Sequence, residues 1–244
     1  TEHGMTDLAY RLLLNEEYPG WLHEVKLGAT TVWERWNSLD ENGRISSTGM
    51  NSLNHYSYGA VLEWIFRHVA GIDVTEQGPG GKMMRISPKV DHKLGSASAV
   101  YDSASGCYRC GWQIENGDQI TVTITVPFGA KAQVILPYAP DSVYHDTDNP
   151  LFETVENGIC CVKAGQYTVT YKAASPLKKS YSVDSTLEDL LAEPAIRAFL
   201  SNMMEVDMIP DLAYGLTLRQ AAEAFAGGVS AEQAQRLNVL LEEF

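Results

Sequence analysis

Two short segments near the start of the chain are rich in aromatic rings and ionisable side chains. They are residues 31–36 (Thr-Val-Trp-Glu-Arg-Trp) and residues 54–58 (Asn-His-Tyr-Ser-Tyr). A carboxylate between two tryptophans is expected in a cleft, where its pKa can be tuned for proton transfer. Aromatic faces bury the C–H surface of sugars while the hydroxyls keep polar partners. Glu34, flanked by Trp33 and Trp36, is therefore a candidate catalytic carboxylate with candidate sugar-binding neighbours.

Glu34 also has two purely structural interpretations. Thr31-x-x-Glu34 fits a capping box, in which the carboxylate accepts a backbone N–H. The same carboxylate can instead pair with Arg35 at the surface. Residue types alone favour these structural interpretations over the catalytic one.

His55 is equally ambiguous, because a single histidine beside a helix N-terminus is more often structural than catalytic. The positive end of the helix disfavours the imidazolium and keeps the ring neutral. A neutral imidazole both donates and accepts, so it can bind two sugar hydroxyls.

A helix must position His55, and the sequence predicts one over about Tyr56–Ala70. Asn54 is a plausible N-cap and Gly71 a plausible stop. An earlier helix is expected over Asp7–Leu14. The apolar stripe of the later helix consists of Ala60, Val61, Trp64, Ile65 and His68.

The periodicity changes from helical to two after the turn-forming run 77–82. Apolar residues alternate with threonine over residues 120–126, and Asn116-Gly117 predicts a type I′ hairpin turn. From about residue 175 the helical period returns. Its capping boxes are Ser185-x-x-Glu188, Thr217-x-x-Gln220 and Ser230-x-x-Gln233.

These patterns predict a multidomain α and β protein with three parts. A helical region covers 1–72, an antiparallel β-sandwich covers 73–174, and a small helical appendix covers 175–244.

The bulk composition excludes several classes of function. The net charge of −13 repels phosphate backbones, so we expect no nucleic-acid partner. No run of 18 uncharged apolar residues occurs, so we expect no membrane span. No nucleotide-binding or metalloprotease motif is present, and we expect no cofactor.

The four cysteines favour free thiols over a metal site. Cys107 and Cys110 lie in a strand pattern, where positions three apart face opposite ways, and Cys160 and Cys161 are neighbours. We therefore expect no metal. Unpaired thiols suit a reducing compartment, so we expect a cytoplasmic location.

Residues 28–36, 50–61, 63–64 and 70–72 resemble the end of the catalytic domain of glycoside hydrolase family 78, the bacterial α-L-rhamnosidases. The similarity continues through Gly80 to Pro88 and covers about a third of the chain. It implies the last helices of an (α/α)6 barrel, followed by a C-terminal β-sandwich. It also implies that Glu34 is the general base of an inverting hydrolysis and that His55 binds rhamnose.

The family's general acid lies in an acidic segment resembling Asp-x-x-x-Arg-Asp-Glu-x-x-Gly-Trp-x-Gly-Asp, which has no match here. We therefore expect this chain, which starts at Thr1 without a methionine, to be a C-terminal portion that is inactive by itself. The expected partners are a rhamnosylated glycoside or oligosaccharide and either the remainder of the catalytic domain or a second copy. The alternatives are a non-catalytic carbohydrate-binding or subunit-contact module, and a glycosidase acting on another sugar.

Overall fold

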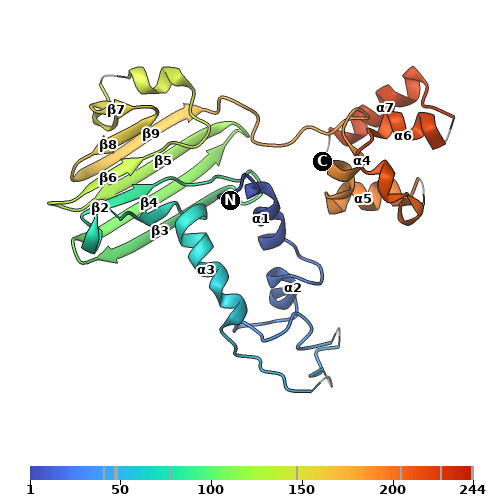
Figure 1. The fold of residues 1–244 in the computed structure, drawn as a ribbon, viewed down its shortest axis with the longest axis horizontal. Coiled ribbons are helices and arrows are strands. Elements are labelled where there is room, and N and C mark those ends of the chain that lie inside the picture. Colours follow the sequence, from blue (N-terminus) through green and yellow to red (C-terminus); the bar gives the residue numbers. More distant parts are fainter. Residues whose placement is uncertain are drawn as a thin grey trace. The chain divides into compact units, whose positions relative to one another are not determined.

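The computed structural model describes residues 1–40, 42–46, 49–76, 78–146, 148–203, 205–225 and 227–242. The chain divides into two compact units, Thr1–Leu177 and Lys178–Phe244 (Figure 1). The three domain boundaries expected from the sequence stay predictions.

The first unit begins with helices α1 (Thr6–Leu13) and α2 (Trp21–Lys26). A later helical segment runs through a 3₁₀ turn η1 (Ser57–Ala60), α3 (Val61–Trp64) and a π-helical turn η2 (Ile65–Val69). Both helices predicted from apolar periodicity are thus found. The periodicity did not predict the succession of 3₁₀, α and π turns. These turns differ in their backbone hydrogen bonds, whereas the apolar periodicity reports only which side chains face the core.

Gly71 ends the helical segment, as predicted. Its φ is +79°, and a Cβ there would lie 2.2 Å from the backbone nitrogen of Pro88. Only glycine fits both the left-handed backbone and this close approach.

Two sheets follow the helical segment. One has the order β1-β2-β6-β8-β7 and the other the order β3-β4-β5-β9. The first sheet comprises β1 (Ile72–Val74), β2 (Met83–Ile86), β6 (Lys131–Val134), β7 (Val155–Glu156) and β8 (Ile159–Val162). The second comprises β3 (Ser96–Ser103), β4 (Gly106–Glu115), β5 (Gln119–Val126) and β9 (Gly165–Lys172). Short 3₁₀ turns occur at η3 (Pro79–Gly81), η4 (Asp141–His145) and η5 (Pro150–Phe152).

The expectation of a wholly antiparallel β region was wrong at one pair. β2 and β6 are parallel, with Met84 opposite Ala132, while the other recorded pairs are antiparallel. The chain leaves the first sheet after β2, forms β3 to β5 in the second sheet, and returns as β6. A long crossover permits a parallel pair, whereas a short hairpin does not.

Strand alternation is confirmed at the positions that the sequence indicated. In β5 the residues Ile120, Val122, Ile124 and Val126 are buried. Cys110 is buried while Cys107 is partly exposed, and Cys160 is buried while Cys161 is exposed. All four thiols are free.

The predicted hairpin joins β4 to β5, with positive φ at both Asn116 and Gly117. Strand pairing resumes at Glu115 and Gln119, so the loop is one residue longer than a two-residue type I′ turn.

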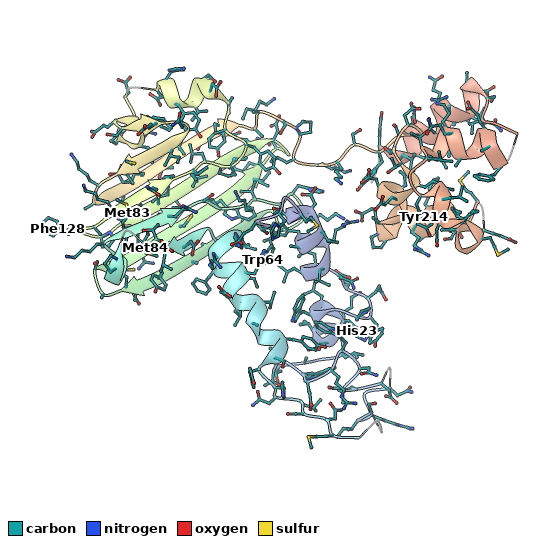
Figure 2. All side chains as sticks on the ribbon, viewed as in Figure 1. His23, Trp64, Met83, Met84, Phe128 and Tyr214 are labelled. Atoms are coloured by element: carbon teal, nitrogen blue, oxygen red, sulfur yellow. The ribbon has the colours of Figure 1, made fainter. Side chains whose placement is uncertain are left out.

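The helical segment and the sheets share one apolar core. The indole N–H of Trp112 on β4 donates to the Val69 carbonyl at 2.7 Å, and both residues are buried. Trp64 of the same segment (labelled in Figure 2) packs edge-on against Tyr10 of α1, with ring centroids 5.3 Å apart. The end of the segment is therefore held between α1 and the sheets.

The second unit has its own apolar core. Its helices are α4 (Leu187–Leu191), α5 (Pro194–Ser201), α6 (Leu218–Phe225) and α7 (Ala231–Leu241), with 3₁₀ turns η6 (Val206–Met208) and η7 (Asp211–Ala213). The starts of α4 and α6 are joined by a β-bridge between Thr186 and Thr217.

Two of the three capping boxes are confirmed. Ser230 and Gln233 bond reciprocally, and so do Thr217 and Gln220. The third, Ser185-x-x-Glu188, is replaced by a single cap one residue later, where the Thr186 hydroxyl accepts from the Asp189 backbone amide at N3. Ser185 instead accepts from the Ser182 amide in the preceding turn.

Within the described residues, no helix combines the length and apolar character that a membrane crossing requires.

We predict that Tyr108→Phe destabilises the first unit by about 1–3 kcal/mol. The buried Tyr108 hydroxyl lies 2.8 Å from the Gly81 carbonyl and 3.0 Å from the Lys131 carbonyl, so its removal leaves buried acceptors without their donor. Denaturant unfolding monitored by tryptophan fluorescence measures the change.

The matched control is Tyr101→Phe, directly opposite Tyr108 across the β3–β4 pair but partly exposed. It should change the free energy of unfolding by less than about 0.5 kcal/mol. Equal effects of the two substitutions would show that the buried hydroxyl bonds are not the cause.

Candidate active site

Backbone pairing places the two candidate segments side by side. The His55 amide donates to the Val32 carbonyl at 2.8 Å, and the Glu34 amide donates to the Ser52 carbonyl at 2.9 Å. Residues 32–34 and 52–55 are thus tied together along one edge, although 21 positions separate Glu34 from His55 in the chain. The hydroxyl of Thr31 adds a hydrogen bond to the Leu53 carbonyl.

Neither structural interpretation of Glu34 is found. The Glu34 amide donates to the Ser52 carbonyl rather than to the Thr31 hydroxyl, so no capping box forms between Thr31 and Glu34. Among the residues that the structure describes, the half-buried Glu34 carboxylate has no hydrogen bond and no ion pair. The carboxylate is therefore available to another molecule.

The prediction of Asn54 as the N-cap was wrong, because the helical segment begins after Tyr56, and the His55 ring bonds its first amide. The Ser57 amide donates to His55 Nδ1 at 3.2 Å. A neutral imidazole that accepts at Nδ1 carries its proton at Nε2. The ring of Tyr56 stacks on the imidazole at 5.2 Å and 10°. The remaining polar atom of His55 is then an N–H donor.

Trp36 belongs to an aromatic cluster with Trp21 and Tyr58. Its ring stacks on Tyr58 with centroids 3.9 Å apart and an interplanar angle of 11°, and Trp21 meets it edge-on at 5.0 Å. The Trp21 indole N–H donates to the Tyr58 carbonyl at 3.1 Å. The cluster therefore joins α2, the loop after Glu34 and the start of the helical segment.

Trp33 is 2% exposed, so its indole is a packing group in this chain. Its backbone amide donates to Glu24 Oε2 of α2 at 3.4 Å. Burial raises the pKa of the Glu24 carboxyl, and the bond from the Trp33 amide partly opposes this shift. Trp33 and Trp36 were both predicted to bind sugar, but they occupy different environments.

Ser38 and Asn51 fasten the loop that follows Trp36. The Ser38 hydroxyl lies 2.6 Å from Asn51 Oδ1, and Asn51 Nδ2 donates to the Ser38 carbonyl at 2.9 Å. The Arg35 amide donates to the Ser38 hydroxyl at 3.2 Å. The two hydrogen bonds between Ser38 and Asn51 therefore extend the pairing of the two segments beyond Glu34.

Sequence reasoning missed Glu24, Ser38 and, as a positioning group, Asn51. No sequence motif marks these polar residues. Only their burial or their hydrogen-bond partners distinguish them from other polar residues of helices and loops. In the part of the chain that the structure describes, no cluster of three or more metal-ligating side chains occurs.

Two family descriptions match adjoining parts of the chain. Residues 1–69 match the bacterial alpha-L-rhamnosidase 6 hairpin glycosidase domain, and residues 71–149 match the bacterial alpha-L-rhamnosidase C-terminal domain. The first match contains Glu34 and His55. The second covers β1 to β6.

Several known alpha-L-rhamnosidases are similar to this chain in sequence and in structure. An alpha-L-rhamnosidase of Alteromonas sp. (strain LOR) is 39% identical over 168 residues, which are 68% of this chain and 17% of that protein. The crystal structure of Streptomyces avermitilis alpha-L-rhamnosidase complexed with L-rhamnose is 34% identical, with a TM-score of 0.61 over 70% of this chain and 16% of that one. The native enzyme from Aspergillus terreus is 27% identical, with a TM-score of 0.57 over 72% of this chain and 18% of that one.

This chain thus spans about a sixth of the length of the relatives it matches. Both of its matched parts carry the descriptions of rhamnosidase domains, and the structural likeness covers 70% of the chain. The chain belongs to the bacterial α-L-rhamnosidase family.

Proposed function

We propose that this chain supplies the general base of a glycoside hydrolase that releases terminal α-L-rhamnose with inversion. The observation that carries the proposal is the backbone pairing of the Glu34 and His55 segments, with a Glu34 carboxylate that bonds to no residue in the described part of the chain. The relatives named above are α-L-rhamnosidases, and one of them is described with bound L-rhamnose.

In the proposed mechanism Glu34 removes a proton from the water that attacks the anomeric carbon. A base must be ionised to do this, and a carboxylate without a protein partner can accept a hydrogen bond from that water. An inverting hydrolase also needs a carboxylic acid about 6.5–9.5 Å away to protonate the leaving oxygen. The acidic segment typical of the family has no match in the sequence, so we propose that another part of the enzyme supplies this acid.

His55 is proposed to orient the sugar. Its Nδ1 is occupied by the Ser57 amide, so its Nε2–H is the group that donates to a rhamnose hydroxyl. Trp36, on its stacked partner Tyr58, is proposed to contact the apolar face of the sugar, while the buried Trp33 supports the segment from within.

The helices of the first unit are proposed to be the last helices of an (α/α)6 barrel, with the sheets as the C-terminal β-sandwich. Exposed apolar side chains on α1 and on the helical segment support this proposal. They include the i, i+4 pairs Leu8 and Leu12, and Leu62 and Phe66. We also propose a cytoplasmic location, which the four free thiols support.

The substitution Glu34→Gln in the complete protein should lower kcat/KM on an aryl α-L-rhamnoside by about 10²–10⁴-fold. Glutamine keeps the shape of the side chain but cannot accept the proton from water. The release of the aryl alcohol measures the rate. Full activity of the variant would remove Glu34 from the base role.

Glu63→Gln is the matched control, because Glu63 is an exposed carboxylate of the same helical region, paired with Arg67 at 3.1 Å. It should leave kcat/KM within about twofold of the wild type, since an exposed pair contributes little.

Inversion predicts that the first sugar released from an α-L-rhamnoside is the β anomer. Proton NMR recorded early in the reaction separates this product from the α anomer formed later by mutarotation. Initial release of the α anomer would exclude a single displacement by water and would instead favour Glu34 as a nucleophile.

We predict that the chain produced by itself forms oligomers. A groove of about 440 Å³ beside the helical segment is lined by Leu62, Phe66, Val74 and Tyr101, and exposed apolar surface of this kind favours association. Light scattering should give a mass above that of the 26.9 kDa monomer. A stable monomer at micromolar concentration would contradict this prediction.

A further inference from the structure

Glu24 is a buried carboxyl group attached to the segment that carries the candidate base. It lies on α2 and is 3% exposed. One oxygen, Oε2, accepts from the Trp33 amide at 3.4 Å, while Oε1 has no hydrogen-bond partner within the described chain. Such burial is costly for a carboxylate, so the position calls for a physical explanation.

The segment 32–34 is held from two opposite sides. On one side, the Val32 carbonyl and the Glu34 amide bond to residues 52–55. On the other side, the Trp33 amide bonds to Glu24. The Val32 carbonyl and the Trp33 amide belong to one trans peptide group, so they point in opposite directions. The 52–55 segment, which bonds to the Val32 carbonyl, therefore cannot also satisfy the Trp33 amide.

Without Glu24 the amide of Trp33 would be a buried donor with no partner, because Trp33 is itself 2% exposed. The segment could then satisfy this amide by rotating or by admitting water. Either change would turn the neighbouring Glu34 side chain, since the two residues share a peptide bond.

We propose that Glu24 is a positioning residue for Glu34: as a neutral carboxylic acid it holds the Trp33 amide and so fixes the direction of the base. The inference rests on the proposed role of Glu34. Burial with one oxygen unpartnered favours the uncharged acid over the carboxylate. Consistent with this, burial raises the pKa of Glu24.

The proposed role of Glu24 requires an uncharged hydrogen-bond acceptor opposite the Trp33 amide. Two substitutions test this requirement. Glu24→Gln keeps a carbonyl acceptor of the same length and is neutral. Glu24→Met keeps the length and the packing volume but removes the acceptor.

The first experiment measures amide hydrogen exchange at Trp33 in this chain and requires no activity. In Glu24→Met the Trp33 amide should exchange about tenfold faster than in the wild type, whereas in Glu24→Gln it should exchange at the wild-type rate. Wild-type exchange in the methionine variant would overturn the proposal.

The second experiment measures kcat and KM for an aryl α-L-rhamnoside in the complete protein. Glu24→Met should lower kcat by about 10–100-fold with KM within about twofold, because a small displacement of a catalytic group slows chemistry more than binding. Glu24→Gln should restore wild-type kcat. A merely stabilising role would instead lower the melting temperature and leave kcat of the folded enzyme unchanged.

Glu34→Gln, assayed beside these variants, separates the two claims. Loss of activity in Glu34→Gln with unchanged kcat in Glu24→Met overturns the positioning role and leaves the base assignment intact. Full activity in Glu34→Gln overturns the base assignment itself. If the methionine variant fails to fold, the glutamine variant decides: wild-type exchange and kcat support the proposal, and a reduced kcat contradicts it.

Discussion

The candidate site depends on the pairing of two loop segments, residues 32–34 and 52–55, through their backbones. The bonds from His55 to Val32 and from Glu34 to Ser52 join pieces of chain that lie far apart in the sequence. Backbone groups are obligatory donors and acceptors, so a pairing of this kind fixes both segments at once. Because the backbone holds the segments together, the Glu34 carboxylate makes no bond to any residue that the structure describes, and His55 uses only Nδ1 within the chain.

Several further contacts convert this pairing into a rigid site. The Ser38–Asn51 bonds extend it, and the aromatic cluster of Trp21, Trp36 and Tyr58 packs α2 against the helical segment. At the far end of that segment, the bond from Trp112 to Val69 fastens it to β4. The position of His55 is therefore linked to the core of the sheets through one continuous stretch of helical backbone.

Family membership and physical reasoning contribute different things to the functional conclusion. The comparisons place residues 1–149 within rhamnosidase domains but cover about a sixth of the relatives' length. The geometry adds that Glu34 has no side-chain partner among the described residues and that His55 offers an Nε2–H donor. Neither capping nor a surface ion pair, the two simpler explanations of Glu34, accounts for its environment.

The sequence by itself determined the features that depend on local periodicity and turn chemistry. The helix before Gly71, the alternation in β5, the hairpin at Asn116 and the two confirmed capping boxes were all predictable, because each rests on residues within about a dozen positions of one another. The tertiary structure alone decided the parallel pair β2–β6, the burial of Trp33 and the environment of Glu24. These features depend on which distant segments meet in space, and no local pattern of residue types specifies such a meeting.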